Sequence, residues 1–186
     1  MTAPPAGMPE PEPGLRQVFR RSCTDVAARM RLPSWEQLRW EMAAPLAGYT
    51  VADLLEAWIA RHLAVAAAFG AKATRRDELP DSPTEAVVEA VRLALRAMPP
   101  DGLPAEATAE VHLAVAEAVV LGWDLQRTIG AGAGPDPRLV EAAMGWVDEL
   151  NGKVWPGLDP IGTGPLAGAT DLLLAGCGRP VGAWAG

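Results

Sequence analysis

Val111-His-Leu-Ala-Val-Ala-Glu-Ala-Val-Val-Leu-Gly-Trp-Asp-Leu125 is the stretch around which the rest of the chain must fold. Its residues are apolar nearly all the way round a helix, and a helix of that kind is buried. Glu117 and Asp124 within it, and Glu110 just before it, follow one another at seven-residue intervals. Seven residues make about two helical turns, so the three acids share one face. The stretch therefore predicts a buried helix with one acidic face.

Glu117 is the acid that most needs a partner. For four positions on either side its neighbours are apolar or small. In a dry core such a carboxylate needs a cation, a metal ion or hydrogen-bond donors, and otherwise its pKa rises. A single structural arginine satisfies it as well as a functional site does, because structural ion pairs also perturb such groups. Both explanations stay open from the sequence.

The composition indicates one soluble domain that binds a small molecule or a protein. A chain of 186 residues is long enough to bury its own core. The formal net charge of −7 argues against nucleic acid or an anionic membrane surface as the partner. Cys23 and Cys177 match neither a zinc spacing nor a disulfide framework, and no signal peptide or long uncharged apolar run is seen. We therefore expect a cytoplasmic protein, and a homodimer stays open.

Apolar residues at helical spacing predict an all-α chain, because no segment alternates as a strand does. Thr50 followed by Asp53, and Ser82 followed by Pro83 and Glu85, are strong helix starts. The expected helices cover residues 14–32, 50–70, 82–98, 104–130, 136–151 and 166–175, with a charged loop at 72–81.

The organisation expected from these helices is one domain over residues 14–186, preceded by a disordered tail. The tail, residues 1–13, holds five prolines and almost nothing that can pack. Short loops between successive helices favour antiparallel neighbours. The fold class is therefore all-α, an up-and-down bundle with additional short helices.

Three segments of the chain resemble a known family. Glu117-Ala-Val-Val-Leu-Gly-Trp-Asp-Leu125, followed by Arg127-Thr-Ile-Gly130 and Asp136-Pro137-Arg-Leu-Val-Glu-Ala-Ala, resembles the Glu-x-x-x-His-Gly-Trp-Asp-Leu signature of the maleylpyruvate-isomerase-like, mycothiol-dependent branch of the DinB-like bundles. Gly48-Tyr-Thr-Val-Ala-Asp-Leu-Leu-Glu-Ala57 is similar to that branch's Gly-Trp-Thr-Val-Arg-Asp-Leu-x-x-His, and Asp171-Leu-Leu-Leu-Ala-Gly-Cys-Gly-Arg179 is similar to its C-terminal Arg-Leu-Leu-Ala-x-x-Gly-Arg. The segments keep the family's order, so the resemblance implies a DinB-like four-helix bundle.

The resemblance also implies a divalent metal, often zinc, held by a His of the second helix and by a Glu and a His four apart on the later helix. Only Glu117 is present here, because the other two positions are Ala57 and Leu121. His62 and His112 each lie five residues from a ligand position, which turns them about 140° away. We therefore expect no metal and place both histidines at helix surfaces or contacts. A metal site rebuilt from them stays open as an alternative.

Arg61 is the expected counter-charge of Glu117. The family brings positions 57 and 117 to one ion, and Arg61 lies one turn beyond Ala57 on the same face. If Arg61 reaches Glu117, the carboxylate stays ionised with a depressed pKa, and if Arg61 turns to solvent, burial raises that pKa. We favour the paired arrangement, because the long Arg stem can lie along the bundle while its head group meets the acid.

The substrate is expected to bind beside this pair. Ala57, Trp58, Leu121 and Trp123 are predicted to line a mostly apolar cavity that carries Glu117, Arg61 and Asp124 as its polar groups. Ordinary core packing is the alternative for the two tryptophans.

The expected function is that of a metal-independent small-molecule enzyme of isomerase, cyclase or lyase type, in actinobacterial-type small-molecule or secondary metabolism. Glu117, Arg61 and Asp124 are its predicted catalytic groups, an apolar small molecule is its substrate, and it uses no cofactor. One alternative is a mycothiol-type S-transferase or isomerase that holds a divalent metal through relocated ligands. Another is a ligand-binding or accessory protein that does no chemistry.

Overall fold

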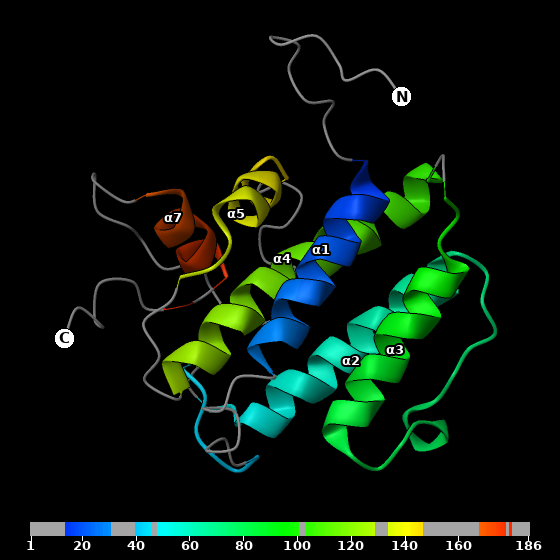
Figure 1. Cartoon of the computed structure of the whole chain (residues 1–186), viewed down its shortest axis with the longest axis horizontal. Helices are drawn as coiled ribbons and strands as arrows, with labels where there is room; N and C mark the ends of the chain where they lie inside the picture. Colours follow the sequence, from blue (N-terminus) through cyan, green and yellow to red (C-terminus); the bar gives the residue numbers. More distant parts are fainter. Residues whose placement is uncertain are drawn as a thin grey trace, which may run out of the picture.

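The computed structural model describes residues 14–30, 40–45, 48–100, 103–128, 134–146, 168–177 and 179. These residues form six α-helices and one short 3-10 turn, and their only bridge of strand type is the isolated pair Ala43 and Thr50. The expectation of an all-α chain is thereby confirmed for the described residues. The elements are α1 (Leu15–Arg29), α2 (Val51–Ala68), η2 (Arg76–Glu78), α3 (Pro83–Ala97), α4 (Ala105–Thr128), α5 (Pro137–Met144) and α7 (Ala169–Gly176), as labelled in Figure 1.

The bounds of α1, α2, α3 and α4 follow the sequence prediction closely. Helix α1 ends at Arg29 and is followed by a turn at Met30, slightly before the expected end. Helix α5 ends at Met144, short of the expected residue 151. The proline-rich tail at residues 1–13, the link at 31–39 and the segment at 147–167 lie outside the described residues.

Local signals explain where α2 and α3 begin. The backbone N–H of Asp53 donates to the Thr50 hydroxyl (3.2 Å), and the Thr50 N–H donates back to the Asp53 carboxylate (2.8 Å). This is the predicted capping box, which satisfies two helix-end donors at once. Gly70 follows α2 with a φ of +77°, a conformation that favours glycine. At α3 the expected start is present, with Pro83 at its first position and Glu85 in its first turn, but the Ser82 side chain makes no capping bond.

Helices α2 and α3 run in the same direction, so the expected up-and-down order is wrong at this step. Arg76 in η2 donates to both carboxylate oxygens of Glu56 (2.8 and 3.0 Å), which holds the connection at residues 69–82 back along α2. Figure 1 shows this connection passing from one end of α2 to the start of α3 at the other. The connection is long enough to span a helix of 18 residues, about 27 Å.

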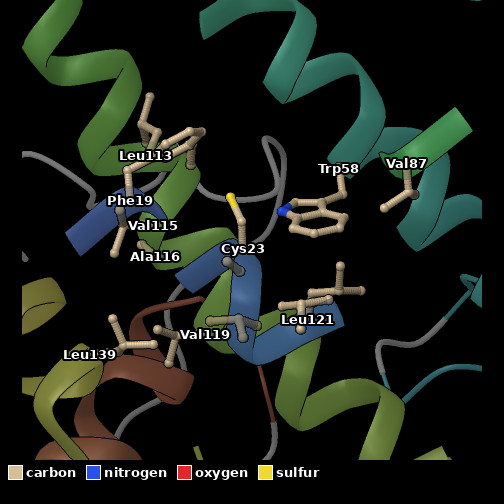
Figure 2. Packing of buried hydrophobic residues seen from close by; sticks show 14 of the residues in the cluster. Phe19, Cys23, Trp58, Val87, Leu113, Val115, Ala116, Val119, Leu121 and Leu139 are labelled. Atoms are coloured by element: carbon tan, nitrogen blue, oxygen red, sulfur yellow. The ribbon is translucent and has the colours of Figure 1, made fainter. Parts of the chain in front are cut away.

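Helix α4 is the central element of the core. Every residue from Val111 to Gln126 is buried, which confirms the prediction for this stretch. Helix α4 packs against α1, α2 and α5, while α3 packs against α2 and α7 packs against α5. Figure 2 shows how side chains from α1, α2 and α4 meet in the core. Each fully buried Val or Leu contributes about 1.5–3 kcal/mol relative to an exposed one.

None of the described helices combines the length and the apolar character that a membrane crossing requires.

Candidate functional site

Arg61 on α2 binds two acids of α4 at once. Its Nη1 donates to Glu110 Oε2 at 2.7 Å, and its Nε donates to Glu117 Oε1 at 3.1 Å. The Nη2 atom also lies 3.1 Å from Glu117 Oε1. The predicted pair of Arg61 and Glu117 is therefore confirmed. The sequence placed Glu110 on the same face of the helix, but it did not predict that both acids share one guanidinium.

The Glu117 carboxylate is buried and only half satisfied. Its side chain is 8% exposed, compared with 18% for Arg61 and 34% for Glu110. Within the described part of the chain, no donor reaches its second oxygen, Oε2. Burial raises the pKa of Glu117, and the nearby Arg61 only partly opposes this. The expected depressed pKa is thus wrong, because desolvation outweighs an arginine that is shared with another acid.

Asp124 lies further along α4 and binds a different arginine. Arg179, just after α7, donates from Nε to Asp124 Oδ1 (3.2 Å) and from Nη2 to Asp124 Oδ2 (2.5 Å), with both side chains fully buried. Burial raises the pKa of Asp124 against the opposing charge of Arg179. The predicted catalytic role of Asp124 stays a prediction. Arg179 ended the third segment of the family resemblance, but its pairing was not predicted.

The four predicted substrate-binding residues belong to the hydrophobic core or pack against it. Trp58 is 2% exposed, Leu121 is fully buried and Trp123 is 6% exposed, and Ala57 is partly buried against the core. Figure 2 shows Trp58 and Leu121 among the packed side chains. Arg127 lies over the Trp123 ring, 5.4 Å from its centroid. Core packing accounts for these positions, and a role in substrate binding stays a prediction.

His62 lies at a contact between α2 and α1 within the core, one of the two expected positions. It is fully buried, its Nδ1 lies 2.8 Å from the Trp58 carbonyl oxygen, and its Nε2 lies 3.4 Å from Cys23 Sγ. The carbonyl can only accept, so Nδ1 carries the proton and the Cys23 thiol donates to Nε2. Burial lowers the pKa of His62 to about 4 and raises that of Cys23 to about 12. Both groups are therefore neutral near pH 7, and their contact is that of a core pair.

The residues around Glu117 do not fit the metal that the family resemblance implies. Arg61 already occupies Glu117 Oε1, which leaves only Oε2 of this carboxylate, whereas a metal site needs three or more protein ligands. His62 is engaged by Cys23, and His112 stacks on Trp146 with ring centroids 4.0 Å apart. Across the described residues, no three His, Cys, Asp or Glu side chains group closely enough to hold an ion. We derive no chemistry through a metal.

A surface hollow lies elsewhere on the molecule. Its lining residues are Glu56, Arg75, Arg76, Asp77 and Asp81. Most of these charges satisfy one another, because Arg76 pairs with Glu56 and Arg75 pairs with Asp77. None of them belongs to the acidic face of α4, so the hollow is not the candidate site.

No protein-family model, curated protein or solved structure matches this chain. Membership of the DinB-like family therefore stays a prediction from the three sequence segments. The chemistry of the site is inferred from Glu110, Arg61 and Glu117 themselves.

Proposed function

We propose that the protein is a metal-independent enzyme that moves a proton on a small molecule, an isomerase, cyclase or lyase built on a DinB-like bundle. The proposal rests on the hydrogen bonding of the Glu117 carboxylate. One of its oxygens is fixed by Arg61, and the other is buried with no donor among the described residues. The resemblance suggests actinobacterial-type small-molecule or secondary metabolism as the setting.

The environment of Glu117 suits general acid and base catalysis. Burial raises the pKa of Glu117, which is the direction in which enzymes shift carboxyl groups that act as general acids or bases. Arg61 holds the carboxylate in one orientation and supplies a fixed positive charge for negative charge that develops on a substrate. The more exposed side chains of Arg61 and Glu110 lie at the solvent side of this cluster.

The same cluster can be compared with the needs of a metal-dependent transferase and of a binding protein. A mycothiol-type transferase that needs a divalent metal is disfavoured by the donor set around Glu117. A binding or accessory protein without chemistry is favoured by one observation, the burial of Trp58 and Leu121 in the core, which is what an inert bundle interior also shows. The two surviving functions differ in what the Glu117 carboxyl group does.

Solvent deuterium exchange separates an enzyme from a binder. The purified protein is incubated in deuterated water with a fractionated small-molecule extract, and mass spectrometry identifies compounds that are converted or that gain carbon-bound deuterium. We expect such a compound with the unmodified protein, none with Glu117→Gln, and retained conversion with Glu89→Gln as the matched control, since Glu89 pairs with Arg92 and Arg96 outside the cluster. Equal labelling by the Glu117→Gln protein would remove Glu117 from the chemistry. Ligand binding without conversion would establish the binder.

A further inference from the structure

The cluster of Glu110, Arg61 and Glu117 holds two carboxylates and one guanidinium. The shortest contact of Arg61, at 2.7 Å, goes to Glu110. Both of its contacts to Glu117 are 3.1 Å, and both end on the same oxygen, Oε1. The more deeply buried acid is therefore the less well neutralised one.

The nearest alternative source of positive charge is already engaged. Arg179 makes two hydrogen bonds to Asp124 and a third to the Cys177 carbonyl oxygen, at 2.6 Å. Its guanidinium weakly favours the charged form of Glu117, but it does not hydrogen-bond to Oε2. In the described part of the chain, the Glu117 cluster thus lacks one cation, and the gap lies at Oε2.

We propose that the substrate carries a protonated amino group, which binds Glu117 at Oε2. This inference rests on the proposed function and names its substrate class. An ammonium group is compact, carries one positive charge and has three donors, so it supplies both the charge and the hydrogen bond that Oε2 lacks. A negatively charged ligand meets two carboxylates here and is repelled. Glu110, at the more exposed side, attracts the cation toward the site.

The proton transfer that follows is balanced. One N–H bond of the bound ammonium breaks, its electron pair stays on nitrogen, and the proton forms an O–H bond at Glu117 Oε2. The products are a neutral amine and a neutral carboxylic acid, which burial favours over the charged pair. The free amine is then a nucleophile that can add to an unsaturated carbon of the same molecule: the C–N bond forms as the π bond breaks, and Glu117 gives its proton to the atom that receives the electron pair.

Calorimetric titration with propylammonium chloride tests the substrate class without knowledge of the substrate. Propanol, which has nearly the same size and no charge, is the matched neutral probe. We expect the full-length protein to bind propylammonium and not propanol. Binding of the cation and not of the alcohol would show that the site recognises the positive charge.

The variants make the assignment to Glu117 specific. Glu117→Gln should weaken propylammonium binding by about tenfold or more, whereas Glu110→Gln should weaken it less. Circular dichroism checks that both variants fold. If Glu117→Gln does not fold, carbon-13 spectra of the unmodified protein replace it, because propylammonium and not propanol should then shift one buried glutamate carboxyl signal.

Several outcomes overturn the inference. They are equal affinity for both probes, no propylammonium binding, or binding that survives unchanged in a folded Glu117→Gln protein. If deuterium exchange still depends on Glu117 after such a result, the proton-transfer function stands and only the amine substrate is wrong.

Discussion

The carboxylate of Asp124 on α4 and the guanidinium of Arg179 after α7 are joined by two hydrogen bonds, and neither side chain is exposed to solvent. Arg179 also binds the Cys177 carbonyl oxygen through its side chain, and its own N–H donates to the Leu174 carbonyl oxygen at 2.9 Å. Helix α7 packs on α5, and this ion pair links its C-terminal end to α4.

Breaking the ion pair of Asp124 and Arg179 should lower the free energy of unfolding, and the loss should depend on which partner is replaced. Asp124→Asn leaves a guanidinium that cannot lose its charge, so we expect a loss of about 3–5 kcal/mol in the free energy of unfolding. Arg179→Met should cost less, because burial already raises the pKa of Asp124 and the acid can take up a proton. Urea denaturation of both variants measures the difference. An equal cost for the two variants would show that Asp124 stays charged without its partner.

The labelling rate of the Cys177 thiol should show whether the ion pair of Asp124 and Arg179 is intact. Burial raises the pKa of both Cys23 and Cys177 to about 12, so both should react slowly with an aromatic disulfide reagent in the native protein. Arg179→Met should speed the labelling of Cys177, whose carbonyl it releases, and leave Cys23 on α1 unchanged. Mass spectrometry of peptides after timed labelling distinguishes the two sites. Parallel acceleration of both would indicate global destabilisation.

Helix capping gives a test with an internal control. Thr50 caps α2 through its hydroxyl, whereas Ser82 makes no side-chain capping bond to α3. Thr50→Ala should therefore lower the free energy of unfolding by about 1 kcal/mol, and Ser82→Ala should lower it by less. Thermal melts of the two variants compare them directly. A larger loss for Ser82→Ala would mean that its hydroxyl caps α3 in solution.

The parts of the fold that depend on neighbouring residues could be predicted from the sequence. The burial of α4 follows from its apolar composition, and the start of α2 follows from Thr50 and Asp53. The pairing of Arg61 with Glu117 was also predictable, because a family resemblance placed their helices together. The direction of α3 was not, since it follows from how α3 packs against α2, and no local signal in the connection at residues 69–82 shows that packing.

The features that depend on distant side chains were missed or misjudged. His62 was assigned to a helix surface or contact and lies at a contact, but the sequence did not show that Cys23 and the Trp58 carbonyl satisfy both of its ring nitrogens in the core. Glu117 was expected to have a depressed pKa, but sequence spacing does not show how one guanidinium is divided between two acids. Arg179 lies more than fifty positions from Asp124, and no local pattern connects them.

His62 should make stability depend on pH in the acidic range. Its pKa is lowered from 6.5 to about 4 in the folded protein, so the unfolded chain binds the extra proton first. The contribution of His62 to the free energy of unfolding is fully present above pH 6.5. It is lost as the pH falls toward about 4, by about 3 kcal/mol in all. The raised pKa values of Glu117 and Asp124 act in the opposite direction. The difference between the unmodified protein and His62→Gln therefore isolates the histidine.

Urea unfolding of these two proteins at a series of pH values measures that difference. The stability of the unmodified protein should fall relative to His62→Gln as the solution is acidified. A constant difference across the range would mean that His62 is accessible to protons in the native state.

Double-mutant cycles at Arg61 should separate its two acids. Arg61→Ala and Glu117→Ala together should cost less than the sum of the single changes, by about 1–3 kcal/mol, because each single change leaves a buried charged partner. The cycle of Arg61→Ala with Glu110→Ala should give a coupling of at most about 1 kcal/mol, since Glu110 is 34% exposed and solvent screens the pair. The weaker coupling is thus expected for the shorter contact, 2.7 Å against 3.1 Å. Thermal and urea unfolding of the five variants measure both cycles. A larger coupling energy with Glu110 than with Glu117 would show that Arg61 mainly stabilises the exposed acid. If the losses from Arg61→Ala and Glu117→Ala simply add, Arg61 does not belong to the proposed site.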